Sequence, residues 1–354
     1  MQHRYFAAAN SSEGFKNYFP EIFGRADRLY IIKGGPGTGK SSFMKKIAKR
    51  AEEMKNEVEY YYCSSDPSSV DGVLMYSEKG AFGIIDGTSP HTYEPYLSGA
   101  KDEIINLGSF WDAKLLYKQK NEIEALTRKK NVNFKRAYKY LRSCGNLRAV
   151  TDSLIEETVD TEKTRAAASR LAKILSEKQT QKEFLYLPAI RNGISMSGRC
   201  SFDSFEKNAD KLYLVGDGYG VGNIFFSLLW EELKKTNVKV KVSYDPVCTG
   251  RIDGIFVEDT CSAVVLSGGE YEENEDGIDR FINPRRFVIP ERLRKVRGEI
   301  RYASKLYEAS LDGALNSLSN AKVYHFLLED IYKNAMDFKA LDEFCEDFIY
   351  DMFK

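Results

Sequence analysis

The sequence of 354 residues predicts an α/β fold of two tandem units, each a three-layer αβα sandwich with a helical extension. Three observations support this prediction. A segment typical of strand, Gly-rich loop and helix occurs at residues 26–41 and again at 209–224. Apolar strand-like segments follow each copy, and a long segment with helical periodicity closes each of them. The chain is also long enough for each half to bury its own core.

The first copy contains a complete phosphate-binding loop pattern. Residues 34–41 read GGPGTGKS, which satisfies G-x-x-x-x-G-K-[ST] between an apolar strand at 29–32 and a helix at 42–54. In such a loop the backbone N–H groups face inward, the lysine reaches the β- and γ-phosphates, and the serine hydroxyl is available to Mg²⁺. The pattern predicts a nucleoside triphosphate site formed by Gly34, Gly35, Pro36, Gly37, Thr38, Gly39, Lys40, Ser41 and Ser42.

The second copy keeps the glycines of this loop but not its polar groups. Aligned without a gap, residues 209–224 place Asn223 opposite Lys40 and Ile224 opposite Ser41. The retained glycines indicate that the turn still serves packing. We therefore expect the second unit to keep the fold, to have lost ordinary Mg·NTP binding, and to contact the first unit as a built-in partner.

The strands after the first loop lead to a candidate metal ligand. Three further strands are predicted, at residues 58–63, 73–76 and 81–85. Asp86 ends the last of them, as expected of the carboxylate that holds Mg²⁺ opposite a phosphate loop. The corresponding run in the second copy, residues 262–267, ends in Ser267, so the acid is missing from the copy that lacks the lysine. This joint loss favours Asp86 with Ser41 as the metal site; a strand-end or turn aspartate is the alternative.

Two other aspartates do not share this loss. Asp66 and Asp71 recur in the second copy as Asp245 and Asp253. Because they stand beside Pro or Gly, we interpret them as turn-forming residues.

The loop after Asp86 reads GTSPH and is expected at the carboxyl ends of the strands, where open α/β sheets bind ligands. Thr88 or Ser89 is a candidate for positioning water or sensing the γ-phosphate, and His91 for contacting phosphate or substrate. A Pro-stabilised turn with a surface histidine is the alternative. Glu94 is a candidate water-activating base. The candidate catalytic residues are therefore Lys40, Asp86 and Glu94.

Helical segments close both units. Residues 111–182 have helical periodicity, and the amphipathic segment at 324–353 predicts core or interdomain contacts rather than a ligand site. The boundary falls near residues 183–191, without a low-complexity linker. The predicted domains are 1–186, with the intact loop and a helical insert, and 187–354, with the degenerate loop.

Composition narrows the function classes. The formal net charge is zero, which argues against nucleic-acid affinity of the whole protein. The six cysteines are scattered and form no C-x-x-C pair, so we expect reduced thiols rather than a disulfide frame or zinc site. No signal peptide and no membrane span are recognised, so we predict a cytoplasmic protein without membrane contact.

The helical segments are locally basic, at residues 114–148 and 285–301. A solvated helix face is the default interpretation of such a run. The alternatives are an acidic protein partner, phosphates or nucleic acid at these helices, or an arginine that stabilises charge on the nucleotide.

These motifs resemble those of a known family. The first unit resembles a P-loop NTPase domain, and the pair resembles a bacterial family of tandem P-loop, ATPase-like proteins. The resemblance spans nearly the whole chain and rests on GGPGTGKSS at 34–42, SSDPSSVDG at 64–72 and DGTSPH at 86–91. It implies ATP binding with Mg²⁺ and hydrolysis.

Three functions are compatible with this pattern. The first is an ATPase whose second unit is a non-catalytic structural or regulatory partner. The second is a nucleotide-sensing scaffold without turnover, and the third is a small-molecule kinase, because the same loop serves both water and other phosphoryl acceptors.

Overall fold

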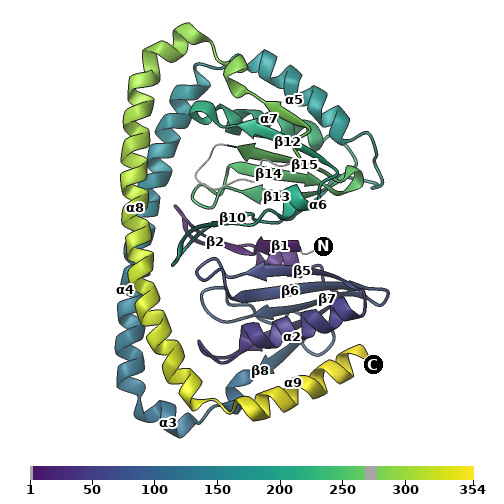
Figure 1. Cartoon of the computed structure of the whole chain (residues 1–354), viewed down its shortest axis with the longest axis vertical. Coiled ribbons are helices and arrows are strands. Elements are labelled where there is room, and N and C mark those ends of the chain that lie inside the picture. Colours follow the sequence, from purple (N-terminus) through teal and green to yellow (C-terminus); the bar gives the residue numbers. More distant parts are fainter. Residues whose placement is uncertain (1–2, 268–276) are drawn as a thin grey trace.

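The computed structural model describes residues 3–267 and 277–354 and contains two mixed six-stranded sheets (Figure 1). This confirms the α/β class. The first sheet has the order β1-β5-β6-β7-β4-β8. Its strands are β1 (His3–Phe6), β4 (Arg28–Lys33), β5 (Glu57–Tyr62), β6 (Val70–Ser77), β7 (Gly80–Asp86) and β8 (Asp102–Asn106).

The second sheet repeats the first, strand for strand. Read from its opposite edge, its order is β9-β13-β14-β15-β12-β16, and each strand holds the place of its counterpart. The strands are β9 (Leu185–Pro188), β12 (Lys211–Gly216), β13 (Lys239–Tyr244), β14 (Ile252–Val257), β15 (Ser262–Ser267) and β16 (Arg280–Ile282). The duplication inferred from the two loops therefore extends to the topology of the sheets.

The smaller elements are duplicated as well. A hairpin and a short helix precede β4 in the first half and β12 in the second. In the first half they are β2 (Ala8–Ser11), β3 (Gly14–Asn17) and α1 (Phe19–Phe23); in the second, β10 (Asn192–Ser195), β11 (Gly198–Ser201) and α6 (Ser204–Asn208).

Strand β4, which leads into the first loop, is apolar on both faces, as expected of a strand with parallel neighbours. It pairs in parallel with β7 and β8. Leu29 and Ile31 point into a core shared by both halves, which also contains the equivalent Leu212 and Leu214. Ile32 faces the other way, toward the helix that follows the loop.

That helix, α2 (Lys40–Glu53), lies against the first sheet. Its buried residues Phe43, Met44, Ile47 and Ala51 recur at helical spacing. The equivalent helix α7 (Val221–Leu233) buries Phe225, Phe226, Leu229 and Leu233 against the second sheet.

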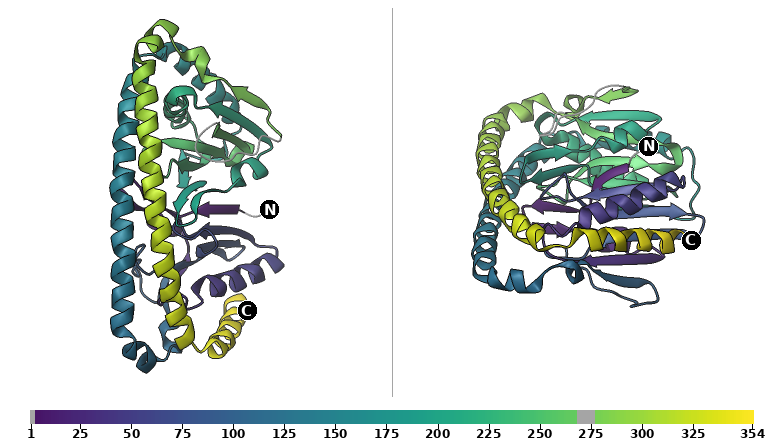
Figure 2. Two further views of the ribbon diagram at one scale, coloured as in Figure 1. Left: turned by 60° about the vertical axis from the view of Figure 1, so that its left-hand side comes forward. Right: turned by 60° about the horizontal axis from the view of Figure 1, so that its bottom comes forward.

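Two long helices run side by side past both sheets, α4 (Lys120–Glu156) and α8 (Pro290–Ala335) (Figures 1 and 2). We call this pair the strap. A short helix, α3 (Ala113–Lys118), precedes α4. An apolar seam of Ala137, Leu141 and Cys144 on α4 with Leu311 and Ala314 on α8 joins the two.

The helices that follow the strap are exchanged between the halves. α5 (Thr161–Leu175), which follows α4, packs with α7 in the core of the second sheet through residues such as Leu171. α9 (Phe338–Phe353), which follows α8, packs with α2 on the first sheet through Leu341 and Phe348. The contact between the repeats that the sequence predicted is thus present. The boundary at residue 186 stays a prediction.

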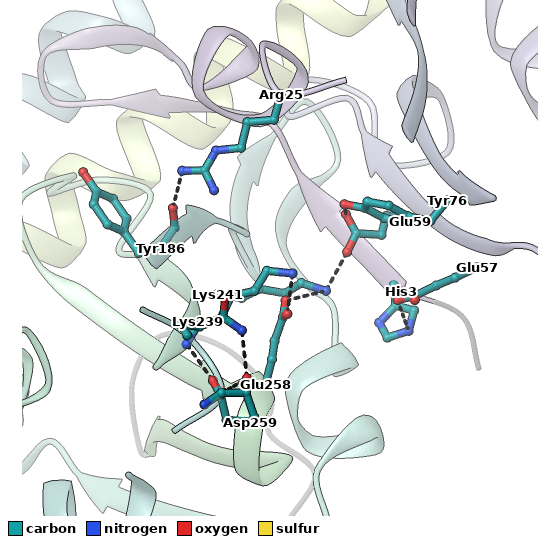
Figure 3. A network of polar contacts seen from close by, with 12 residues as sticks. His3, Arg25, Glu57, Glu59, Tyr76, Tyr186, Lys239, Lys241, Glu258 and Asp259 are labelled. Atoms are coloured by element: carbon teal, nitrogen blue, oxygen red, sulfur yellow. Dashed lines mark hydrogen bonds and ion pairs between the residues drawn. The ribbon is translucent and has the colours of Figure 1, made fainter. Parts of the chain in front are cut away.

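A buried ion pair links the two halves (Figure 3). Lys241 Nζ on β13 lies 2.5 Å from Glu59 Oε1 on β5, and the hydroxyl of Tyr61 donates to Glu59 Oε2 at 2.8 Å. Burial opposes both charges, but their attraction prevails, so the pKa of Glu59 is lowered and that of Lys241 is raised. Glu59 and Lys241 occupy equivalent strand positions. Each lies two residues before the residue that pairs with the glycine of the neighbouring strand, which is Tyr61 with Gly72 and Ser243 with Gly254. The repeats therefore meet through opposite charges at one duplicated position.

In the described part of the chain, no helix combines the length and apolarity needed to cross a membrane.

Candidate nucleotide site

The loop between β4 and α2 is shaped by two glycines in the left-handed region. Gly37 has φ 71° and Gly39, which precedes α2, has φ 83°. Lys40 Nζ bends back over the loop and donates to the carbonyl oxygens of Gly34 at 3.0 Å and Gly35 at 2.6 Å. Thr38 Oγ1 also donates to the Gly35 carbonyl, at 2.9 Å. The side chains of Lys40 and Thr38 therefore stabilise the loop through hydrogen bonds to its own carbonyl groups.

Asp86 lies at the carboxyl end of β7, beside Ile32 of β4. Its Oδ1 accepts hydrogen bonds from the backbone N–H and hydroxyl of Thr88, at 2.9 and 2.6 Å. Its Oδ2 lies 3.5 Å from Lys40 Nζ. Ser41 lines the same cavity, and its Oγ accepts from the backbone N–H of Val70 at 2.9 Å. The structure thus brings together the lysine, serine and aspartate that the sequence selected.

A buried pair lies next to Asp86. His91 Nε2 is 3.1 Å from Asp71 Oδ2, and the His91 side chain stacks on Phe19 with ring centres 4.9 Å apart. Burial alone would lower the pKa of His91, but Asp71 and then Asp86 raise it to about 9. The imidazole is thus protonated at neutral pH and balances the neighbouring carboxylates.

This placement corrects the interpretation of Asp71 as a turn residue. Asp71 lies within β6, where its side chain points to His91 rather than to a turn. Asp66 does form a turn, since its Oδ1 accepts from the backbone N–H and hydroxyl of Ser68 at 3.1 and 2.8 Å. The alternative of a surface histidine is wrong for His91, which is only 5% exposed.

The loop opens into a cavity of about 860 Å³ that the strap borders on the opposite side. From α4, Lys130, Phe134 and Tyr138 line it, and from α8, His325, Glu329 and Lys333 do so. The contact with α8 is close, because a Cβ placed on Gly37 would lie 2.6 Å from the Glu329 carbonyl oxygen. The second half of the chain therefore supplies one wall of the first half's site.

Lys130 brings a second cation to this cavity. Burial, and then the nearby ammonium of Lys40, lower the pKa of Lys130. In the described residues it has no carboxylate partner. Asp86 pairs with Lys40, whereas Lys130 lines the same cavity without a carboxylate of its own among the described residues, and this surplus positive charge favours an anionic ligand. The sequence signal for Lys130 was only its membership of the basic run in residues 114–148.

Glu329 forms ion pairs within the strap helix α8. It pairs with His325 Nε2 at 3.4 Å and with Lys333 Nζ at 2.8 Å, each one helical turn away. The hydrogen bond from His325, together with Lys333, lowers the pKa of Glu329 to about 2. Glu329 therefore stays ionised but is neutralised by its two neighbours.

The structure does not bring Glu94 into the cavity. Its side chain is 68% exposed and pairs with Lys33 Nζ at 2.7 Å, outside the residues that line the cavity. Lys33 in turn donates to the carbonyl oxygens of Gly87 and Tyr93, which fixes it on that side of the loop. Glu94 thus serves as the partner of Lys33.

Two sets of residues are placed to hold a cation. Ser41 and Asp86 border the loop, as predicted for Mg²⁺. Asp71, Asp86 and His91 each offer a ligand atom within 4.8 Å of the others. Mg²⁺ prefers oxygen ligands, so Ser41 and Asp86 fit it better than the set that includes the His91 imidazole.

The second loop departs from the first in register. The buried residues of α2 and α7 match when α7 is moved one residue relative to the gapless alignment, so that Phe43 corresponds to Phe225. Both helices follow a glycine in the left-handed region, Gly39 before α2 and Gly220 before α7. The first residues of α7 are Val221, Gly222 and Asn223, so the lysine is missing in each of these registers.

A similar shift affects the partner of Asp86. Asp86 faces Ile32, whereas the residue facing the equivalent Val215 is Leu266. The counterpart of Asp86 is therefore Leu266, and the assignment of Ser267 is wrong by one residue. In either register the second copy lacks this acid.

Comparisons of the chain with protein-family models, with curated proteins and with solved structures give no match.

Proposed function

We propose that the chain binds Mg·ATP at the Lys40 loop and hydrolyses it, while the second unit is a non-catalytic partner that completes the site. The observation that carries this proposal is the convergence of Lys40, Ser41 and Asp86 in one cavity. In this proposal both units are P-loop NTPase-like αβα domains, and the protein acts in the cytoplasm.

The residues of the loop suit a triphosphate. The backbone N–H groups of Gly35 and of residues 37–40 would surround an anion at the N-terminus of α2, and Lys40 would exchange its loop carbonyl contacts for phosphate oxygens. Ser41 and Asp86 would hold Mg²⁺, which supplies charge neutralisation at the β- and γ-phosphates. The ammonium of Lys130 approaches from the strap and adds positive charge as the γ-phosphoryl group departs.

In this proposal, the attacking water is oriented by hydroxyl groups, because no carboxylate among the described residues of the cavity is without a partner. Thr88 and Ser89 line the cavity next to Asp86 and are placed to orient water. Among the described residues, the cavity carboxylates are engaged: Asp71 with His91, Glu329 with His325 and Lys333, and Asp66 with its turn. We therefore expect slow intrinsic turnover.

The same observation supports a second candidate, a nucleotide-sensing scaffold that binds ATP without turnover. Because α8 of the strap contacts the loop at Gly37, a bound nucleotide would contact or displace parts of both halves even if it were never cleaved. Tight ATP binding without phosphate release distinguishes this candidate from the ATPase.

Phosphate release and ATP binding by purified protein test the proposal. Lys40→Ala should abolish both, because the lysine is the loop's cationic contact to the β- and γ-phosphates. The matched change Asn223→Ala, on the first turn of α7, should leave both near the wild-type level. Equal losses in the two variants, or none in Lys40→Ala, would contradict the division of labour between the halves.

A further inference from the structure

A second cavity, of about 730 Å³, lies beside the degenerate loop. It occupies the place in the second half that the nucleotide cavity occupies in the first. Asp217 comes from the loop, Asn192 and Asp253 from β10 and β14, and Arg301 and Lys305 from the strap helix α8. Like the first cavity, it has one wall from a sheet and one from the strap.

This cavity is not shaped for a triphosphate. A Cβ placed on Gly222, in the first turn of α7, would lie 3.0 Å from Asp217 Oδ1. The Asp217 carboxylate therefore lies at the helix N-terminus, where the intact loop would hold a phosphate. Arg251 is also engaged within the chain, by Asp152 at 3.1 Å and by Asp217 at 3.8 Å. A phosphate at this position would meet a fixed negative charge.

The wall of the cavity formed by the sheet carries buried carboxylate oxygens that lack hydrogen-bond donors among the described residues. Asp253 is 4% exposed, and its Oδ2 accepts from Asn192 Nδ2 at 2.7 Å. The Oδ1 atoms of Asp253 and of Asp217 are buried and have no hydrogen-bond partner among the described residues. Buried acceptors of this kind are costly unless a donor reaches them, and an ammonium group offers three N–H donors.

The strap wall has the opposite character. Arg301 and Lys305 lie one helical turn apart on α8, and in the described part of the chain neither forms an ion pair. The nearby Glu308 is engaged by Arg199 at 2.7 Å. Two adjacent free cations suit a carboxylate.

We propose that this cavity binds a small zwitterion of the amino-acid class, with its ammonium on Asp217 and Asp253 and its carboxylate on Arg301 and Lys305. The proposal concerns binding alone and does not depend on ATP turnover at the first site.

Isothermal titration of the full chain with each of the twenty standard amino acids tests it. At least one should bind, and three derivatives of the tightest ligand should each bind about tenfold more weakly or worse. These are its N-acetyl form, its amide and its N-trimethyl betaine, which lack the ammonium, the carboxylate and the N–H donors respectively. If no amino acid binds, or the betaine binds as tightly as the parent, the cavity holds only water or another class of ligand and the proposal is wrong.

Matched variants locate the binding. Lys305→Met should weaken it about tenfold, because it removes one of the two cations facing the carboxylate. Lys295→Met, an exposed lysine on the same helix outside the cavity, should leave it unchanged. Asp253→Asn should also weaken it, with circular dichroism confirming the fold. Equal affinities of wild type and Lys305→Met would overturn the proposal. Lys40→Ala should retain amino-acid binding, so failure of the ATPase proposal remains distinguishable.

Discussion

At the scale of single residues, the site is organised by charges that balance one another. Asp86 faces Lys40, and the adjacent Asp71 faces a protonated His91. The imidazolium neutralises one carboxylate, so the other keeps its charge available for a cation. His91 is thus a positioning residue that acts through Asp71 and Asp86.

The pH dependence of stability tests this role of His91. Its pKa of about 9 in the folded chain lies above its ordinary value of 6.5. The stabilisation is therefore complete below pH 6.5 and is lost as the pH rises through 9. We expect His91→Gln to remove on the order of 2 kcal/mol of wild-type stability near pH 6 and little above pH 10.

Urea unfolding at several pH values measures this difference. Asp71→Asn, which removes the carboxylate but keeps the histidine, should flatten the pH dependence in the same way. A constant difference between wild type and His91→Gln from pH 6 to 10 would show that His91 contributes only packing.

The sequence could supply part of this site. Lys40, Ser41 and Asp86 follow from local spacing, because the loop and the strand end carry their own signals. Lys130 and Glu329 could not be selected, since helical periodicity shows which face of α4 or α8 is apolar but not which loop that face approaches. Glu94 was chosen for its nearness along the chain, and the side chain of Lys33 holds it elsewhere.

At the scale of elements, two glycines of the strap differ in how closely they are packed. A Cβ placed on Gly145 of α4 would lie 2.6 Å from Ser12 Cβ, where the helix crosses the turn between β2 and β3. Gly298 of α8 has no atom within 4 Å of such a Cβ. The first glycine permits a close approach, whereas the second only adds flexibility to the helix.

Alanine at these two positions should act in opposite directions. Gly145→Ala is expected to destabilise the fold by about 1–3 kcal/mol, because Ser12 cannot retreat without moving its backbone. Gly298→Ala is expected to stabilise it by about 0.5–1 kcal/mol, through helix propensity. Thermal and urea unfolding of both variants provide the measurement. Equal effects would mean that α4 does not touch the hairpin.

Element prediction succeeded where the pattern was strong. The strands expected at 58–63, 73–76 and 81–85 are β5, β6 and β7, each within three residues of its predicted ends. The helical segment 111–182 is present but is divided into α3, α4 and α5. Strand β8 was missed, because its five residues begin with two acids and show no clear alternation.

At the scale of the whole molecule, each half supplies a helix to the hydrophobic core of the other. α9 covers the first sheet and α5 the second, so neither core is finished by its own half alone. Periodicity predicted core or interdomain contacts for the tail at 324–353 rather than a ligand site. Leu341 and Phe348 make such contacts, but Phe338 of the same tail lines the cavity, so the prediction holds only in part. The exchange itself could not be predicted, because it depends on the length and direction of α4 and α8 rather than on their apolar faces.

The buried pair between the halves gives a measurable prediction. Lys241→Met leaves the Glu59 carboxylate buried without its partner and should cost about 3–5 kcal/mol of unfolding free energy. Adding Glu59→Gln should recover much of this loss, because no buried charge then remains. Urea unfolding of both variants provides the comparison. A double variant no more stable than Lys241→Met alone would show that the pair is not coupled.

The central claim is that one Mg·ATP binds beside Lys40, under the strap, and none beside Gly222. A crystal structure of the full chain with Mg²⁺ and a non-hydrolysable ATP analogue tests it most directly. The account predicts triphosphate density along residues 35–41, with the metal near Ser41 and Asp86 and Lys130 facing the γ-phosphate. Nucleotide seated at the second loop, with the Lys40 loop empty, would contradict it.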